Sequence, residues 1–511
     1  KVLEEVSVRP ENKKNKRESL VTTYLQRDFD PEIKNKIKES ISKEKTAFVI
    51  CPTKESARDT FNTLSKDFPS ATLIFPGNKT KKTIKQIEQI ILSNEPLVVV
   101  SLPSIFSIPV KDLGLVLIEK ENSNAYKTMR KPYFDVRRFI FHYTKAVGAD
   151  LILKDFPVSV DAHEYLKETK SDSTISDVKV IDMTDEKEKT KSFVFSKSAL
   201  ETIKKKIKAE KNIFLFNLRK GLASEVVCHD CGKAVIQDGV NLSLHVDRKT
   251  GERYFKNVLT NKRFDTKVRC DNCDSWNFDS LGIGTETVEE EFKKMFPSTK
   301  VFRIEKEITN TEKKVKETIE KWNKSKGGIL IGTEMSLPHI KNYIDETIVV
   351  SFDTLFNIPS YKINEKIISL VEQMSQKTKG SVILQTRRAD TPLLKSIKGL
   401  KMQDFYKKEI FLRKALSYPP FGSIIKISGK SHRNKADKNN DFIEKVLESF
   451  NYTKNVKLLG NYIETVFTIK TKDHSFTYKE NEGSKELQNL KKNLRNLPPH
   501  FEIRLNPEKL F

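Results

Sequence analysis

The sequence contains no uninterrupted apolar run of about 18 residues, the length that an α-helix needs to cross a bilayer. It does not begin with a secretory leader, and its 511 residues include only 5 cysteines. It also lacks the sequence G-x-x-x-x-G-K-[ST], whose backbone N–H groups cradle phosphates in P-loop proteins. These absences argue against membrane-spanning and disulfide-rich secreted proteins, and we expect a soluble, cytoplasmic protein.

Basic charge is what the chain has in excess. Its 93 Lys and Arg residues outnumber 69 Asp and Glu residues, which gives a formal net charge of +24. Such a surface attracts phosphate backbones through counterion release, so the charge favours a nucleic-acid partner. The plainer alternative is that most of these lysines only solvate helix surfaces.

Four of the five cysteines form two C-x-x-C pairs, Cys228 with Cys231 and Cys270 with Cys273. Each pair turns two thiolates toward one point, and two pairs complete the tetrahedral sulfur shell that Zn²⁺ prefers. Two disulfides, buried thiols or a redox motif are the alternatives, and they fit a chain without a leader less well. We therefore predict one structural zinc ion, and we expect Cys51 to be a buried structural cysteine.

Short apolar runs alternate with helical stretches in two successive regions. In the first, strands are predicted near 47–51, 71–75, 97–100 and 115–118, with helices between most of them. The second repeats the pattern, and both C-x-x-C pairs interrupt it. Strands separated by helices favour parallel sheets covered on both faces. From Ser423 the order becomes strand, helix, strand, strand, helix, strand, which is typical of a split βαβ domain.

This pattern predicts an α/β fold with two RecA-like helicase lobes, a zinc-binding insertion in the second lobe and a C-terminal α+β domain. The predicted divisions are a basic arm (1–22), lobe 1 (23–167), a linker (168–195), lobe 2 (196–402) with the insertion (226–280), and the C-terminal domain (403–511).

Several segments, in their common order, resemble the PriA family of bacterial replication-restart helicases. They include VVVSLPSIF from Val98, LGLVLIEKENSNAYK from Leu113, CDNCDSWNFDSLGIGTET from Cys270, and DFYKKEIFLRKALSYPPFG from Asp404. The resemblance covers most of residues 45–425. It implies a helicase core of two lobes and a role at branched or single-stranded DNA.

The segments that handle ATP in this family have diverged here. Where the resemblance places the phosphate loop, residues 25–31 contain neither glycine nor lysine, and the family's DEEH box appears as Glu119, Lys120, Glu121 and Asn122. A protonated Lys120 at the position of the catalytic base is a poor base. The family's two arginines after Gln373 are absent, and its Ser-Ala-Thr-Pro motif appears as residues 154–157, KDFP. We therefore expect no catalytic or cofactor-binding residues for ATP hydrolysis.

The family has eight cysteines and two zinc sites, of which this chain retains the outer four cysteines. By position these correspond to one complete site, with Cys228, Cys231, Cys270 and Cys273 as its ligands. The resemblance therefore implies one Zn²⁺.

The first hypothesis is a DNA-binding protein of replication restart and primosome assembly that does not hydrolyse ATP. Its expected partners are forked or single-stranded DNA, replication-restart proteins and single-stranded DNA-binding protein. The alternatives are an active ATP-dependent DNA helicase with diverged motifs and a protein-interaction scaffold. Basic residues interleaved with aromatic ones follow the altered DEEH box, a composition suited to phosphate contact and base stacking; the predicted DNA-binding residues are Lys127, Arg130, Lys131, Arg137 and Arg138.

Overall fold

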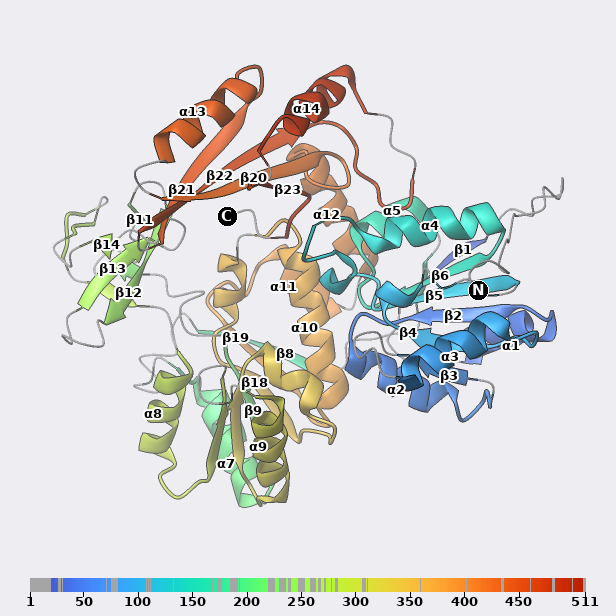
Figure 1. Ribbon diagram of the computed structural model, residues 1–511. Coiled ribbons are helices and arrows are strands. Elements are labelled where there is room, and N and C mark those ends of the chain that lie inside the picture. Colours follow the sequence, from blue (N-terminus) through green and yellow to red (C-terminus); the bar gives the residue numbers. More distant parts are fainter. Residues whose placement is uncertain are drawn as a thin grey trace. The chain divides into compact units, whose positions relative to one another are not determined.

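The fold was analysed in a computed structural model that describes most of residues 20–508 (Figure 1). The longer segments outside the description are 1–19, 26–28, 75–80, 172–176, 184–191, 219–225, 229–235, 247–252, 258–262, 265–267, 281–283, 306–308, 433–435, 480–482 and 509–511, and shorter gaps occur elsewhere. The described chain divides into two compact units. Unit 1 comprises Lys1–Ser173 and Ser475–Asn481, and unit 2 comprises Thr174–His474 and Glu482–Phe511.

Unit 1 contains a seven-stranded sheet with the order β3-β4-β2-β5-β6-β1-β7. All of its neighbouring strands pair in parallel. Its elements are β1 (Val21–Leu25), α1 (Pro31–Ser42), β2 (Thr46–Ile50), α2 (Lys54–Leu64), β3 (Ala71–Ile74), α3 (Lys81–Leu92), β4 (Val98–Ser101), β5 (Leu113–Glu119), α4 (Val136–Val147), β6 (Asp150–Asp155), α5 (Val160–Leu166) and β7 (Thr169–Ser171).

Continuous apolar strands form the centre of this sheet. Every residue of β2 and β4 is buried, as a parallel strand covered on both faces requires. Helix α1 contributes Ile33 and Ile37, which lie four residues apart on one helix face and join the core around Val49. The core thus lies between the sheet and its helices.

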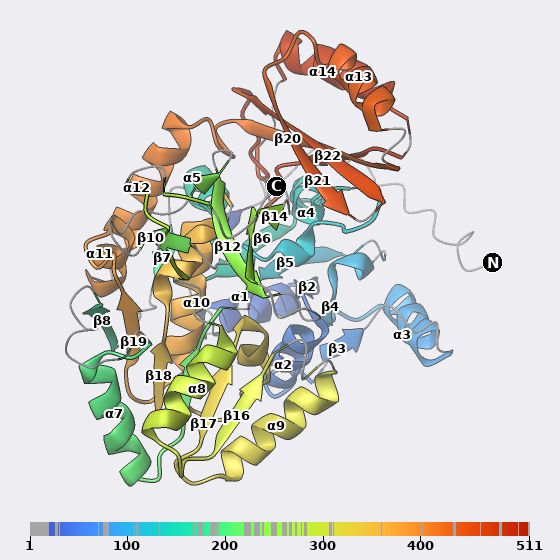
Figure 2. The same cartoon turned by 90° about the vertical axis from the view of Figure 1, so that its left-hand side faces the viewer.

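Unit 2 contains a six-stranded parallel sheet with the order β16-β17-β9-β18-β19-β8. Helices pack around it in Figures 1 and 2. The strands are β8 (Val178–Asp182), β9 (Ile213–Phe216), β16 (Val301–Ile304), β17 (Ile329–Gly332), β18 (Glu346–Val349) and β19 (Val382–Thr386). The helices are α7 (Lys197–Lys208), α8 (Thr285–Met295), α9 (Glu312–Lys324), α10 (Ile363–Lys377), α11 (Pro392–Gly399) and α12 (Met402–Ala415).

The cysteine-containing insertion lies between β9 and α8 and is built from short antiparallel strands. A two-stranded sheet joins β10 (Val226–Cys228) to β15 (Phe278–Ser280). A second sheet contains β11 (Ile236–Gln237), β12 (Val240–Val246), β13 (Arg253–Asn257) and β14 (Arg263–Phe264). Val226, Leu242 and Phe255 form its small apolar core.

The C-terminal part of unit 2 has an antiparallel sheet with the order β21-β22-β20-β23. Its elements are β20 (Ser423–His432), α13 (Ala436–Val446), β21 (Tyr452–Leu459), β22 (Tyr462–Thr471), α14 (Lys485–Arg495) and β23 (Glu502–Leu505). This order confirms the predicted split βαβ domain, and the two parallel sheets confirm the predicted α/β lobes.

The structure differs from the predicted divisions at the linker. Residues 168–195 include β7, which extends the sheet of unit 1, and β8, which pairs with β19 in unit 2. The boundary between the two units falls within this predicted linker, but the two strands were not predicted, because short edge strands carry too few apolar residues to stand out in a polar segment. The predicted arm ends within β1, which begins at Val21, and its first 19 residues lie outside the description.

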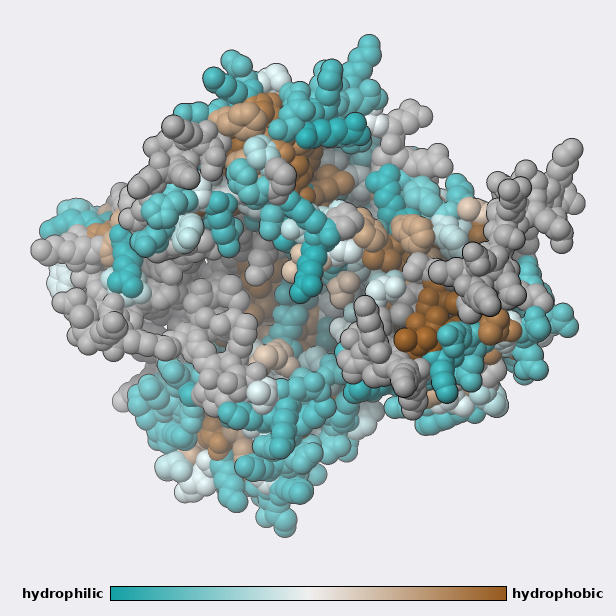
Figure 3. Space-filling model, in the orientation of Figure 1, coloured by the Kyte–Doolittle hydropathy of each residue, from teal (hydrophilic) through white to brown (hydrophobic). Residues whose placement is uncertain are grey.

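Hydrophilic residues predominate on the face drawn in Figure 3, where apolar colour is confined to separate patches. Among the described helices, none combines the length and the apolar character needed to cross a membrane.

Candidate functional site

The carboxyl ends of the parallel strands β2, β5 and β6 lie at one edge of the unit 1 sheet, the edge at which open α/β sheets commonly bind ligands. Strand β5 ends at Glu119, whose Cα partner on β6 is Lys154. The Nζ atom of Lys154 lies 2.6 Å from a carboxylate oxygen of Glu119, and the side chains are only 1% and 6% exposed. A buried ammonium group therefore neutralises the carboxylate of Glu119, the first residue of the altered DEEH box.

The groups around this ion pair are also buried. The Lys154 ammonium lies 4.4 Å from the ring centroid of Phe29, which belongs to the connection between β1 and α1. The Tyr126 hydroxyl donates to the carbonyl oxygens of Ile50 and Glu119 at 2.9 and 2.5 Å. Burial raises the pKa of the neighbouring Cys51 thiol to about 12, and the Glu119 carboxylate adds to the shift, so this thiol stays protonated and inert.

Most of the predicted phosphate-loop segment, including residues 26–28 and 30, lies outside the described residues. On either side of this segment, β1 ends at Leu25 and α1 begins at Pro31, and β1 is a strand that the sequence did not predict. Lys120, at the position of the catalytic base, is half-buried and has a left-handed backbone with φ of 51°.

Glu121 lies in a second buried group and is fully covered. Its carboxylate accepts the Ser159 N–H at 2.8 Å and the Ser159 hydroxyl at 2.9 Å. It also accepts the Tyr478 hydroxyl at 2.6 Å and an Arg137 N–H at 3.4 Å. With four donors and no solvent-exposed surface, this carboxylate has a structural environment rather than a catalytic one.

Arg137, one of the five predicted DNA-binding residues, is 3% exposed. Its guanidinium donates to both carboxylate oxygens of Asp135 at 2.9 and 2.5 Å and to the Glu121 carbonyl oxygen at 2.6 Å. Burial alone would lower its pKa, but Asp135 and the other nearby acidic groups raise it well above the usual value. Its donors are used inside the protein, so we remove Arg137 from the predicted set.

The other four predicted residues lie at the surface. Arg130 and Lys131 are exposed, and Lys127 and Arg138 are half-buried. Lys127 pairs with Asp135 in an isolated β-bridge, so residues 127–135 form a closed loop, which we term the basic loop. Within the basic loop, the Thr128 N–H donates to the Phe134 carbonyl oxygen at 3.0 Å, and the Phe134 N–H donates to the Thr128 hydroxyl at 2.9 Å.

The tip of the basic loop combines cations with exposed apolar side chains. Met129 is 75% exposed and Phe134 is 48% exposed, on either side of Arg130 and Lys131. Asp135 closes the loop and also caps α4, because its carboxylate accepts the Arg137 N–H. This arrangement can present positive charge to phosphates and an aromatic face to a base.

Three of the four predicted zinc ligands converge in the insertion. The Sγ atoms of Cys228, Cys270 and Cys273 lie within 4.8 Å of one another, and those of Cys228 and Cys273 are 3.4 Å apart. The sulfur atoms of a disulfide are about 2.05 Å apart, whereas two thiolate sulfurs bound to one tetrahedral zinc ion lie about 3.8 Å apart. The three thiols therefore form a cluster that can hold a metal ion. Cys231, the predicted fourth ligand, lies outside the described residues.

A tight turn fixes one side of the cysteine cluster. The Asp274 N–H donates to the Cys270 carbonyl oxygen at 2.8 Å, and the Cys270 N–H donates to the Ser275 carbonyl oxygen at 2.9 Å. Asp274 has a φ of 56°, in the left-handed region that such a turn needs. On the other side, β10 carries Cys228 and pairs with β15.

No protein-family model matches the chain. Among curated proteins, it is 25% identical over 374 residues to the replication restart protein PriA of Borreliella burgdorferi, covering 70% of this chain and 55% of that one. It is 25% identical over 406 residues to PriA of Bacillus subtilis, covering 75% and 50%. PriA of Thermotoga maritima is 24% identical over 421 residues, covering 79% and 55%. The chain spans about half the length of these curated relatives.

Comparison with solved structures finds weak matches, among them RecG bound to a three-way DNA junction, with 10% identity, a TM-score of 0.38, and coverage of 78% of this chain and 47% of that one. The helicase MrfA bound to DNA has 10% identity and a TM-score of 0.38, with coverage of 87% and 54%.

Proposed function

We propose that this chain, a divergent relative of the PriA replication restart proteins, binds branched or single-stranded DNA in replication restart and primosome assembly without hydrolysing ATP. The observation that carries this proposal is the buried ion pair between Glu119 and Lys154 at the edge of the unit 1 sheet.

ATP hydrolysis in such a domain requires a carboxylate for Mg²⁺ and a base that orients water. Here the carboxylate of Glu119 is paired with the Lys154 ammonium, and both groups are buried. A divalent ion would have to displace that ammonium and leave a buried lysine without its partner, which is costly. Lys120 in place of the base adds positive charge at the same edge.

DNA binding has separate support from the basic loop. Lys127, Arg130, Lys131 and Arg138 remain as proposed DNA-binding residues, and Phe134 offers a face for stacking. The net charge of +24 favours an anionic partner over the whole chain. In this proposal the lobe acts as a scaffold that holds the basic loop.

The proposed cofactor is one Zn²⁺ held by Cys228, Cys231, Cys270 and Cys273. Three of these thiols already converge at distances that suit a tetrahedral ion. A bound zinc would supply structural cross-linking of the short strands around it. The small apolar core of Val226, Leu242 and Phe255 would not be expected to hold the insertion alone.

The test of DNA binding compares the double variant Arg130→Ala/Lys131→Ala with Lys204→Ala/Lys205→Ala. The control pair lies on the exposed face of α7 and removes the same charge. Affinity for a fluorescent DNA fork is measured at several salt concentrations. The loop variant should bind more weakly, and its slope of log K against log salt should fall by about 0.7–0.9 per lost phosphate contact. Equal effects of the two variants would contradict a specific role for the basic loop.

ATP turnover with the same fork tests the second half of the proposal. We expect only background hydrolysis from the unaltered chain, and no change on Glu119→Gln. Fork-stimulated turnover that Glu119→Gln abolishes would favour an active helicase instead. Absence of any fork affinity would favour a protein-interaction scaffold.

A further inference from the structure

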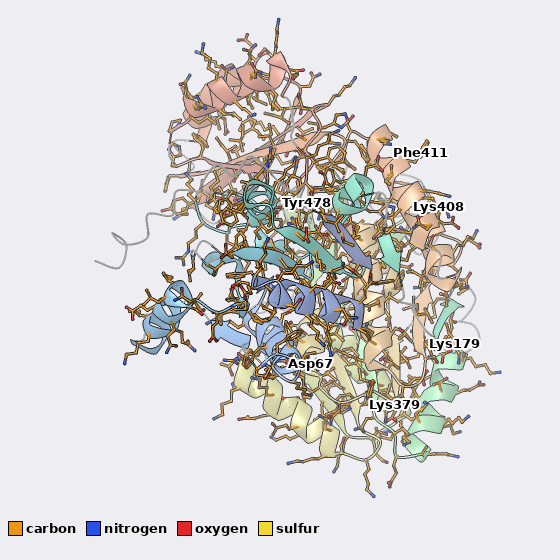
Figure 4. All side chains as sticks on the ribbon, turned by 90° about the vertical axis from the view of Figure 1, so that its right-hand side faces the viewer. Asp67, Lys179, Lys379, Lys408, Phe411 and Tyr478 are labelled. Carbon is orange, nitrogen blue, oxygen red and sulfur yellow. The ribbon has the colours of Figure 1, made fainter. Side chains whose placement is uncertain are left out.

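Residues Ser475–Asn481 leave the C-terminal domain and belong to unit 1. This segment, which we term the strap, connects β22 to α14 in the sequence. Its Thr477 N–H donates to a carboxylate oxygen of Asp161 on α5 at 2.7 Å. Its Tyr478 ring makes an edge-to-face contact with Phe141 on α4, with centroids 5.9 Å apart. Figure 4 shows Tyr478 among the teal helices of unit 1.

Tyr478 is completely buried, and its hydroxyl donates to the Glu121 carboxylate at 2.6 Å. Burial raises the pKa of this phenol well above its usual value, and Glu121 adds to the shift, so the hydroxyl remains a donor at physiological pH. Glu121 of the altered DEEH box thus accepts a hydrogen bond from a residue 357 positions later in the sequence.

A continuous chain of polar contacts runs from Tyr478 to the basic loop. Glu121 contacts Arg137 through both its carboxylate and its carbonyl oxygen. The Arg137 guanidinium donates two hydrogen bonds to the Asp135 carboxylate. Asp135 in turn closes the basic loop through its backbone β-bridge to Lys127. Although burial opposes it, Arg137 lowers the pKa of Asp135, which keeps this carboxylate charged for these hydrogen bonds.

We propose that Tyr478 is a positioning residue for DNA binding, because it fixes Glu121 and Arg137 and through them the conformation of the basic loop. The inference rests on the proposed function only for its effect on DNA. Its structural content, that the strap orders the basic loop, stands independently. Tyr478 itself has no accessible surface and cannot contact DNA.

The substitution Tyr478→Phe removes only the hydroxyl and retains the ring that contacts Phe141. Tyr462→Phe is the control, because Tyr462 lies on β22 outside the strap and is 54% exposed. Two readouts are measured on the full chain. One is the rate of tryptic cleavage between Arg130 and Lys131, at the tip of the basic loop, and the other is affinity for a DNA fork.

Cleavage at Arg130 reports the open population of the basic loop without involving DNA. Loss of a hydrogen bond to a buried carboxylate should raise the cleavage rate about tenfold in Tyr478→Phe and not in Tyr462→Phe. Fork affinity should fall several-fold in Tyr478→Phe. Unchanged cleavage would overturn the inference. Faster cleavage with unchanged fork affinity would support the positioning and contradict the proposed DNA-binding role of the basic loop.

A double-mutant cycle with Glu121→Gln tests the route of the effect. If Tyr478 acts through Glu121, adding Tyr478→Phe to Glu121→Gln should change cleavage by less than twofold. Fully additive effects would show that the strap orders the basic loop by general packing and would overturn the proposed route.

Discussion

At the carboxyl edge of the unit 1 sheet a buried carboxylate is paired with a buried ammonium group, whereas in the insertion of unit 2 three side chains of one kind, all thiols, converge. Lys154 neutralises Glu119, and the lone thiol of Cys51 is held protonated by burial. The thiols of Cys228, Cys270 and Cys273 instead meet at distances too long for disulfides and suitable for one ion. A buried carboxylate can therefore be neutralised by another side chain of the protein, whereas clustered thiolates that hold a metal need the ion itself.

The largest expected effect separates the two kinds of cysteine. Cys270→Ser should abolish tight zinc binding and unfold the insertion. In small zinc domains the apparent free energy of zinc binding, about 10–16 kcal/mol, also stabilises the fold. Cys51→Ala is the control and should retain the metal. Zinc content by mass spectrometry and hydrogen exchange across residues 226–280 measure both outcomes. Retention of zinc by Cys270→Ser, or its loss from Cys51→Ala, would contradict the assignment.

An intermediate effect is expected at the ion pair. Lys154→Met leaves the Glu119 carboxylate buried without its partner and should lower the free energy of unfolding by about 3–5 kcal/mol, measured in urea. The double variant Lys154→Met/Glu119→Leu should recover most of that loss. Lys313→Ala breaks an exposed pair with Glu317 and should have no measurable effect. Unchanged stability of the Lys154→Met variant would contradict this prediction, because it would mean that water reaches Glu119 at the carboxyl edge of the unit 1 sheet.

The smallest effect is a pH dependence at the strap. Burial raises the pKa of Asp161 to about 6, although the Thr477 N–H opposes the shift. In the unfolded chain the pKa of an aspartate is about 3.9, so the folded state binds the Asp161 proton more tightly. The contribution of Asp161 to stability therefore falls as pH rises from about 4 to 6. The loss amounts to at most about 3 kcal/mol. The free energy of unfolding of the Asp161→Asn variant should not show this loss when it is measured between about pH 4 and 6. An identical pH profile for the variant and the unaltered protein would refute the prediction.

The sequence predicted the parallel lobes and the C-terminal domain because their buried strands are short apolar runs. It missed β7 and β8, which lie at sheet edges and contain few apolar residues. It predicted that Cys228 would lie near Cys270 and Cys273, because two C-x-x-C pairs in one chain are typical of a shared metal site. It misplaced Arg137, although Asp135 two residues earlier is a recognisable helix cap that could have indicated an internal partner. Nothing local could have joined Tyr478 to Glu121, because that contact depends on the tertiary fold.

The strap also determines when the first lobe can be completed during synthesis. Glu121 emerges from the ribosome 357 residues before Tyr478. At about 5–20 residues per second, that interval lasts roughly 20–70 s. Throughout it the nascent lobe has a carboxylate and an arginine in its interior without their final covering residue. The strap can therefore dock onto this lobe only after Tyr478 has been synthesised, as a late step in the folding of the lobe.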